Sequence, residues 1–287
     1  MMSACECKIL IKGAGDLASG VALRLFRSGF PVAMTELPHP LMVRRTVSFG
    51  EAVNEGEAIV EGLMAKLVPD ASAMEMALSD RCASRFIPVI VDPEAQCKLL
   101  IKPLVIIDAI MAKRNLGTRI DDAPFVVALG PGFVAGADCH AIVETNRGHN
   151  LGRVLYSGSA EPDTGIPGEI GGKTVERLLR SPADGILEAI SEIGDQVRAG
   201  QTVAIVNGRE VVSQIDGILR GLVRSGMSVT KGLKIGDVDP RATRDHCFLV
   251  SDKSLAIGGG VLEAVMARLA SEAMRENGNR AISTRCR

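Results

Sequence analysis

The sequence predicts an α/β protein with a Rossmann-like N-terminal domain and a small all-β domain of the barrel-sandwich hybrid type. Two observations carry this prediction. Residues 8–37 read as a strand, a glycine turn, a helix and a second strand. Residues 184–238 contain an internal repeat. We therefore expect a nucleotide-binding region with a glycine-rich extension at 1–175, the hybrid domain at 181–240, and a C-terminal strand–glycine–helix segment at 241–287 that returns to the first domain.

Composition restricts the classes of partner. Hydrophobic residues make up 46% of the 287 residues and the net charge is −1, so we expect a packed core and neither nucleic acid nor a membrane as partner. With no Trp and one Tyr, the chain lacks the aromatic residues of a base-stacking surface. No secretory segment and no run of roughly 18 apolar residues is visible, which favours a cytoplasmic protein with reduced thiols.

The first unit begins with a β-branched strand at Lys8–Lys12 and continues as a helix whose apolar residues recur at helical spacing. Gly29 ends this helix, and the next strand closes at Glu36. The arrangement is typical of the first half of a doubly wound sheet.

The glycine turn of this unit is the first candidate site. Gly13 permits the tight turn, Gly15 leaves room for a pyrophosphate, and Ala18 lets the helix lie close to the strand. Glu36 has the spacing of an acid that binds a ribose diol. Asp16 is unfavourable beside a phosphate unless a cation neutralises it. The alternative is a purely structural turn with a solvated Glu36.

Further elements follow along the chain. Apolar runs predict strands at 58–68, 86–92, 103–112, 124–133, 139–145 and 152–158, and residues 70–83 read as a helix. The stretch 163–173 is rich in turn residues and predicts a boundary or a lid.

The second candidate site lies between residues 129 and 153. Gly130, Gly132 and Gly136 predict an anion-binding backbone loop, and Arg147 is a candidate partner for phosphate or carboxylate. Asp138 and His140 are the candidate catalytic residues. A metal site of Asp138, His140 and His149 is a less favoured alternative, so we expect no metal.

The repeat consists of two halves that begin at Asp184 and Asp216 and share eight identical positions. It resembles the hybrid fold of biotinyl and lipoyl carrier domains. The hairpin between the halves, Asn207–Gln214, contains no Lys, so we expect neither biotin nor lipoate.

The last segment predicts a strand, a triple glycine and a helix. Gly258, Gly259 and Gly260 precede an apolar helical pattern and form a candidate second backbone cradle for a ligand. Cys5 and Cys7 have no second pair at metal-site spacing, which favours an ordinary chain terminus over a ligand pair.

Several stretches together resemble one family. They are "KGAGDLASG", "VIIDAIMAKRN", "LGPGFVAGADCHAIVETNRGHNLGR", the repeat and "AIGGGVLEAV". They are similar to the YqeB-type accessory family of selenium-dependent molybdenum hydroxylase systems, and "IGGGVLE" also resembles XdhC/CoxI proteins, which accompany enzymes such as xanthine dehydrogenase. The resemblance implies maturation of a molybdenum hydroxylase client enzyme, with a dinucleotide or a molybdenum-cofactor nucleotide as ligand.

Two other functions remain open from the residues. One is an NAD(P)-dependent oxidoreductase with His140 as proton donor. The other is a non-catalytic docking or scaffold protein. In each case we expect a homo-oligomer.

Overall fold

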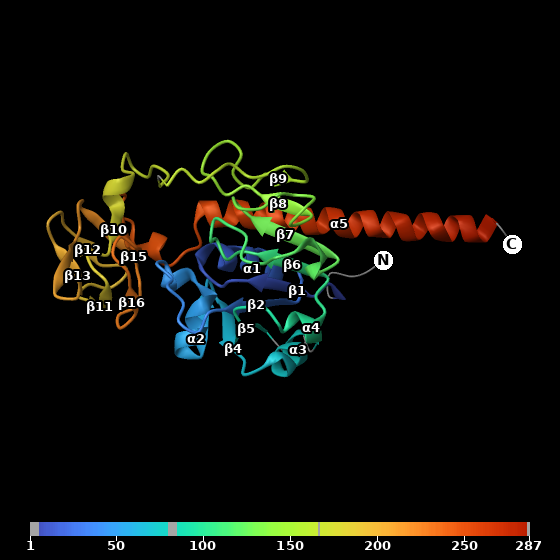
Figure 1. Ribbon diagram of the computed structural model, residues 1–287, viewed down its shortest axis with the longest axis horizontal. Coiled ribbons are helices and arrows are strands. Elements are labelled where there is room, and N and C mark those ends of the chain that lie inside the picture. Colours follow the sequence, from blue (N-terminus) through green and yellow to red (C-terminus); the bar gives the residue numbers. More distant parts are fainter. Residues whose placement is uncertain (1–5, 80–84, 166, 286–287) are drawn as a thin grey trace.

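The computed structural model describes residues 6–79, 85–165 and 167–285. A large α/β body, residues 6–155 together with the last helix, lies beside a small β unit formed by residues 178–239 (Figure 1). An irregular segment rich in turns joins the two.

The body is built on a mixed sheet of nine strands in the order β3-β4-β5-β2-β1-β6-β7-β8-β9. The strands from β4 to β8 in this order are all parallel, and β3 and β9 are antiparallel edge strands. Their bounds are β1 Ile9–Lys12, β2 Val32–Glu36, β3 Glu57–Val60, β4 Leu63–Leu67, β5 Phe86–Val91, β6 Val105–Asp108, β7 Phe125–Leu129, β8 Ala141–Val143 and β9 Val154–Leu155.

Helices cover both faces of this sheet. Alternate side chains point to opposite faces of a strand, so Ile9 and Ile11 pack under α1 (Asp16–Arg27) and α5 (Asp252–Arg285). Leu10 faces the other side, where α3 (Ala71–Ser79) and α4 (Lys98–Ile101) pack. A short helix, α2 (Ala52–Glu55), leads into β3. The core strands are therefore buried on both faces, which explains their continuous apolar sequence.

The small unit contains two four-stranded antiparallel sheets with a shared apolar core. One has the order β10-β17-β15-β12 and the other β14-β13-β11-β16. The strands are β10 Leu178–Arg180, β11 Gly185–Ala189, β12 Gln196–Val197, β13 Thr202–Val206, β14 Arg209–Val212, β15 Gly217–Leu222, β16 Ser228–Val229 and β17 Lys234–Asp239. Strands β11, β12 and β13 begin at 185, 196 and 202, and β15, β16 and β17 begin at 217, 228 and 234. The sequence repeat is thus also a structural repeat.

The small unit is held against residues 43–55 of the body. A Cβ on Gly221 would come within 2.8 Å of Val43, so only glycine allows this approach. Arg224 forms ion pairs with Glu51 and Glu55. These contacts fix one wall of the site described below.

The long helix α5 starts beside the small unit, crosses the body and projects beyond it (Figure 1). By length and composition alone, its stretch Asp252–Met274 is apolar enough to cross a membrane. Part of this stretch, including Ile257 and Val261, belongs to the core under the sheet. The prediction that no membrane partner exists stays a prediction.

The predicted fold class is wrong. The large sheet is mixed rather than the open parallel sheet of a Rossmann-like domain, and the β6–β7 and β7–β8 connections contain no α-helix among their residues 109–124 and 130–140. Residues 178–239 form two four-stranded antiparallel sheets around a shared apolar core. The unit at 8–37 determines only how β1 and β2 are joined, and nothing local in it determines the later crossovers.

Two smaller predictions also change. The apolar stretch 58–68 is the hairpin β3–β4, because Glu61 and Gly62 both adopt positive φ at its turn. The strand expected after residue 247 is irregular chain that runs directly into α5. Part of the helix expected at 70–83 lies outside the described residues.

Candidate functional site

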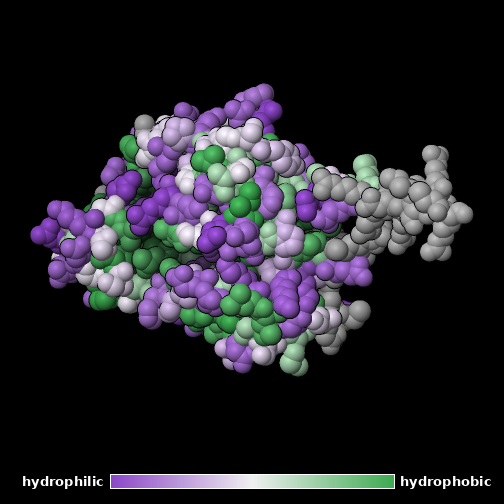
Figure 2. Space-filling view, turned by 45° about the vertical axis from the view of Figure 1, so that its right-hand side comes forward, coloured by the Kyte–Doolittle hydropathy of each residue, from purple (hydrophilic) through white to green (hydrophobic). Residues whose placement is uncertain are grey.

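A cavity of about 450 Å³ lies between the two parts of the chain. Figure 2 shows the surface hollowed on the side where the small unit meets the body. On the side of the α/β body, the wall of the cavity consists of the loops that follow β1, β6, β7 and β8 and of the start of α5. The carboxyl ends of parallel strands are the usual place for a ligand in such sheets.

The lining of this cavity is strongly basic. Among the described residues that line it, only four are acidic, namely Asp16, Glu161, Asp163 and Asp237. The basic ones are Arg44, Lys113, Arg147, Arg177, Arg180, Arg220, Lys234 and Lys253. The excess of cations in a concave site favours an anionic ligand.

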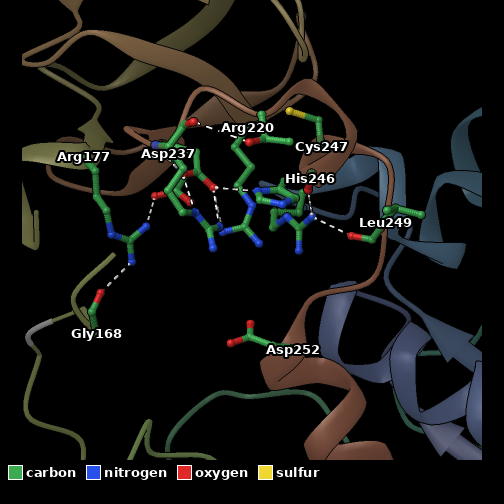
Figure 3. A network of polar contacts seen from close by, with 12 residues as sticks. Gly168, Arg177, Arg220, Asp237, His246, Cys247, Leu249 and Asp252 are labelled. Carbon is green, nitrogen blue, oxygen red and sulfur yellow. Dashed lines mark hydrogen bonds and ion pairs between the residues drawn. The ribbon is translucent and has the colours of Figure 1, made fainter. Parts of the chain in front are cut away.

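On the small-unit side, Arg177 and Arg220 are only 7% and 6% exposed. The Arg177 guanidinium forms an ion pair with Asp237 and donates a hydrogen bond to the Gly168 carbonyl oxygen at 3.2 Å. Nη1 of Arg220 lies 3.7 Å from Oδ2 of Asp239. Figure 3 shows this network facing Asp252, which lies at the start of α5 across the open space. In the part of the chain that the structure describes, Nε of both arginines is buried without a hydrogen-bond partner.

Lys234 and Lys253 add two ammonium groups to the cavity. Burial lowers the pKa of both, because it disfavours the charged form. The charge of Asp237 opposes this shift at Lys234 and that of Asp16 opposes it at Lys253, whereas Arg177 and Arg147 lower the pKa of Lys234 and of Lys253, respectively. Neither ammonium has a carboxylate within 4.0 Å among the described residues. An anion in the cavity would relieve this accumulation of positive charge.

On the body side, α1 and α5 both begin at the cavity, where Asp16 and Lys253 line it. The Ser254 hydroxyl joins the two helices by donating to the carbonyl oxygen of Asp16 at 2.8 Å. Arg147 holds the start of α5 through two hydrogen bonds to Asp252, at 2.6 and 3.1 Å. These bonds place the positive ends of two helix dipoles beside the basic side chains.

Arg44 completes this wall. It is 8% exposed and donates hydrogen bonds to the carbonyl oxygens of His246 at 2.8 Å and Leu249 at 3.1 Å. Its Nη1 lies 4.0 Å from the Asp16 carboxylate, which is thereby partly neutralised.

Part of the predicted glycine-turn site is engaged by the protein's own groups, although the space at Gly15 is open. Glu36 accepts hydrogen bonds from the backbone N–H of Ala14 at 2.8 Å and of Leu37 at 2.7 Å, so its carboxylate is engaged. Burial raises the pKa of Glu36, and these two bonds oppose the shift. The Gly50 N–H donates to the Ala14 carbonyl oxygen at 2.8 Å, which brings residues 48–50 onto the turn.

The individual positions of that turn agree with a structural role. Gly13 has φ +92° and packs against the backbone of Ala109, whereas a Cβ on Gly15 would meet nothing within 4 Å. Ala18 is buried beneath α5 in the body core. Of the residues predicted for this site, only Asp16 reaches the cavity.

The glycines after β7 are explained by close packing. Cβ atoms on Gly130 and Gly132 would come within 2.3 Å of Thr145 and 2.6 Å of Arg114. Gly136 has φ +91° in an open turn. Of the residues predicted in this region, Arg147 alone lines the cavity.

The triple glycine is part of helix α5, so the prediction of a backbone cradle is wrong. A Cβ on Gly258 would meet Arg24 at 2.9 Å, and one on Gly260 would meet the Gly152 carbonyl oxygen at 2.1 Å. Gly259 faces open space. Two of these glycines therefore allow α5 to pack closely on the body.

The predicted catalytic pair does not reach the cavity. His140 precedes β8 at the opposite end of the sheet, and its Nδ1 accepts a hydrogen bond from the Val126 N–H at 3.0 Å. Burial, and next Arg268, lower its pKa. Asp138 accepts the Val134 N–H at 2.8 Å within a turn. No group of three metal-ligating side chains occurs among the described residues, so Asp138, His140 and His149 are not assembled into a metal site.

The cysteines at the amino terminus separate into two cases. Cys5 lies outside the described residues. Cys7 is fully buried, and burial raises its pKa to about 12, which keeps the thiol protonated.

No protein-family model matches the sequence. The chain is 52% identical over 260 residues to a protein of Escherichia coli K12 named "Uncharacterized protein YqeB", and the match covers 90% of this chain and 47% of that protein. The chain thus spans about half the length of the curated relative it matches. The predicted membership of the YqeB-type family stays a prediction.

The chain is also similar to several solved structures, and each match covers 81% of it. One is an aspartoacylase family protein of Mesorhizobium loti, with 11% identity, a TM-score of 0.27 and 84% of that chain covered. Another is the ectoine utilization protein EutE of Ruegeria pomeroyi, with 14% identity, a TM-score of 0.25 and 84% covered. A third is a succinylglutamate desuccinylase/aspartoacylase of Rhodobacter sphaeroides, with 14% identity, a TM-score of 0.27 and 85% covered.

These comparisons correct the predicted function. None of the structures named above is described as a molybdenum hydroxylase accessory protein, and the prediction of molybdenum-cofactor maturation, with its selenium and xanthine dehydrogenase associations, is not borne out. The Glu36 carboxylate, expected to bind a ribose, is engaged by two backbone N–H groups, which argues against the dinucleotide ligand and, with it, the NAD(P)-dependent oxidoreductase. The docking or scaffold alternative is not tested and stays a prediction. TM-scores below 0.3 assign no activity to this chain in their place. The predictions of a partner enzyme, a homo-oligomer and a cytoplasmic location stay predictions.

The residues that dominate the site were missed by the sequence analysis. Arg220 occupies the position in the second half of the repeat where the first half has the exposed Glu188. Asp237 occupies the position in the second half where the first half has Ile205. A charge in one half where the other half has an apolar residue, as at Asp237, is the signal that could have identified this wall.

Proposed function

We propose that this protein binds a small anionic organic molecule in the cavity between the body and the small unit. The observation that carries the proposal is the basic lining of a concave site of about 450 Å³, a volume suited to a small ligand. Of the three lysines of the lining, Lys113 is paired with Asp163, whereas Lys234 and Lys253 have no carboxylate within ion-pair distance among the described residues, so a bound anion would supply countercharge to these two.

The type of anionic group follows from the side chains. Planar guanidinium groups bind carboxylate or phosphate through two parallel hydrogen bonds, and ammonium groups bind either as point charges. Arg177 and Arg220 are held by Asp237 and Asp239, so their positions are set before a ligand arrives. A preorganised site of this kind limits the entropy lost on binding.

The test is isothermal titration calorimetry with citrate and with pyrophosphate at low and at high salt. We expect at least one of them to bind at a single site, with an affinity that falls as salt screens the charges. Lys234→Gln should weaken this binding roughly tenfold, the loss of one charge-assisted hydrogen bond.

The matched control is Lys231→Gln, because Lys231 is an exposed lysine of the same unit outside the cavity lining. It should bind the probes as the unaltered protein does. Absence of binding for both probes, or equal weakening by the two variants, would contradict the proposal.

A further inference from the structure

Arg220 differs from the other arginines that line the cavity. Arg44, Arg147, Arg177 and Arg180 each donate at least one hydrogen bond to a carbonyl oxygen or a carboxylate. Arg220 is only 6% exposed, yet among the described residues its guanidinium donates no hydrogen bond, and its ion pair of 3.7 Å is longer than one. A buried polar group without a hydrogen-bond partner is rare and calls for an explanation.

The acidic residues of this wall are already engaged by other arginines. Arg241 donates two side-chain hydrogen bonds to Asp239, from Nε at 2.9 Å and from Nη2 at 2.6 Å. Arg177 pairs with Asp237. Each of these carboxylates therefore has a guanidinium in hydrogen-bond contact, and Arg220 is left without such a partner.

The free donors of Arg220 face the cavity. Its Nε is enclosed by the protein, so Nη1 and Nη2 are the atoms that a ligand can reach. In Figure 3 the Arg220 side chain extends toward the open space opposite Asp252. The end of a guanidinium group offers two parallel N–H groups, which pair with two oxygens of one anionic group.

A carboxylate matches these donors better than a phosphate does. The two Nη atoms satisfy both oxygens of a carboxylate, whereas a phosphate has a third oxygen that needs a donor. Phosphate sites often supply such donors from backbone N–H groups at a helix start. At the start of α5 these groups are engaged, because the Ser254 N–H donates to the Ser251 hydroxyl at 3.1 Å and the Lys253 N–H donates to Asp252.

The charges at this wall also favour a singly charged group. Asp237 and Asp239 lie beside the arginines and repel a dianion more strongly than a monoanion. Taking a dianion out of water costs more as well. Lys234 lines the cavity from the same unit and offers an ammonium donor that has no carboxylate within 4.0 Å among the described residues.

We infer that the ligand is an organic acid whose carboxylate binds to Nη1 and Nη2 of Arg220, with Lys234 as the neighbouring donor. This inference rests on the proposed function, because it assigns the chemical group of a ligand in the same cavity. Arg220 then selects a carboxylate over a phosphate, and the pairing of Asp239 with Arg241 keeps its donors free for the ligand.

The experiment compares malonate with methylenediphosphonate, which has the same skeleton with phosphonates in place of carboxylates. Calorimetry should give malonate an affinity roughly tenfold higher, although methylenediphosphonate carries more charge. Arg220→Lys keeps the charge but loses the parallel donors, so it should weaken malonate binding roughly tenfold and methylenediphosphonate binding less. The matched control is Arg209→Lys, at an exposed arginine of the same unit outside the lining, which should leave malonate binding unchanged.

A second measurement does not depend on the folding of a variant. In crystals of the unaltered protein grown with malonate, one carboxylate should lie with its two oxygens on Nη1 and Nη2 of Arg220. Malonate bound elsewhere would overturn the inference. Circular dichroism of Arg220→Lys shows whether its loss of affinity occurs in a folded protein.

The outcomes separate this inference from the proposed function. Methylenediphosphonate binding that equals or exceeds malonate binding, or an Arg220→Lys variant that binds malonate as the unaltered protein does, would overturn the carboxylate assignment and leave anion binding standing. If citrate, pyrophosphate, malonate and methylenediphosphonate all fail to bind, the proposed function and the inference fail together.

Discussion

Gly260 gives the sharpest test of how α5 is packed. A Cβ at this position would lie 2.1 Å from the Gly152 carbonyl oxygen and 2.9 Å from Cγ1 of Val143. Cβ atoms essentially never approach closer than 3.0 Å, so Gly260→Ala must open this contact by about 0.9 Å. Gly152 approaches α5 closely at a second point as well, since a Cβ on Gly152 would lie 2.7 Å from the Ala256 carbonyl oxygen.

The expected magnitude combines two opposing effects. Inserting a methyl group into a packed contact costs about 1–3 kcal/mol. Replacing glycine by alanine inside a helix stabilises by roughly 1 kcal/mol. Gly259 is the matched control, since its Cβ position is in open space one residue away in the same helix. Gly259→Ala should therefore stabilise the protein, and Gly260→Ala should be less stable than it by about 1–3 kcal/mol.

Urea unfolding followed by circular dichroism measures both variants against the unaltered protein. The difference between the two alanines removes the helix-propensity effect and leaves the packing cost. Equal stabilities, or a more stable Gly260→Ala, would refute the close contact between α5 and the Gly152 loop. That result would also reopen the interpretation of the triple glycine as a loop.

Two further predictions concern ionisable groups. His140 accepts a hydrogen bond from the Val126 N–H and has a lowered pKa, so the imidazole takes up a proton more readily in the unfolded chain than in the folded protein. The stability of the fold should therefore fall as the pH drops through the unfolded pKa of about 6.5. Thermal unfolding between pH 8 and 5 should show this dependence, and His140→Gln should flatten it. The same variant should bind citrate and pyrophosphate as the unaltered protein does, whereas weakened binding would place His140 in the site. Burial disfavours the charged form of Lys234. In the absence of ligand, Lys234→Gln should therefore raise the free energy of unfolding by roughly 1 kcal/mol, and it should also weaken anion binding. A loss of stability would show that the charge of Lys234 is compensated within the protein.

Sequence reasoning reached the elements better than their assembly. The strands at 9–12, 32–36, 86–91, 105–108 and 125–129 are apolar and β-branched, and local pattern is enough to identify such strands. The order in which they pair depends on contacts between distant residues, and the crossovers after β6 and β7 follow without helices that a pattern could reveal.

The triple glycine shows why local propensity failed in α5. Glycine disfavours a helix in isolation, but here the close contacts of Gly258 and Gly260 require it. The site was only partly predictable for a related reason. Asp16 and Arg147 were identified, but Arg44, Arg220 and Lys234 come from three separate stretches that meet only when the small unit packs on the body. Their common function is a property of the assembled cavity.

The most direct test is the position of a heavy anion in crystals of the protein. Tungstate has the shape and charge of phosphate, and its anomalous scattering identifies it unambiguously. We predict a peak inside the cavity, beside Lys234 and Lys253. No peak in the cavity would contradict the account.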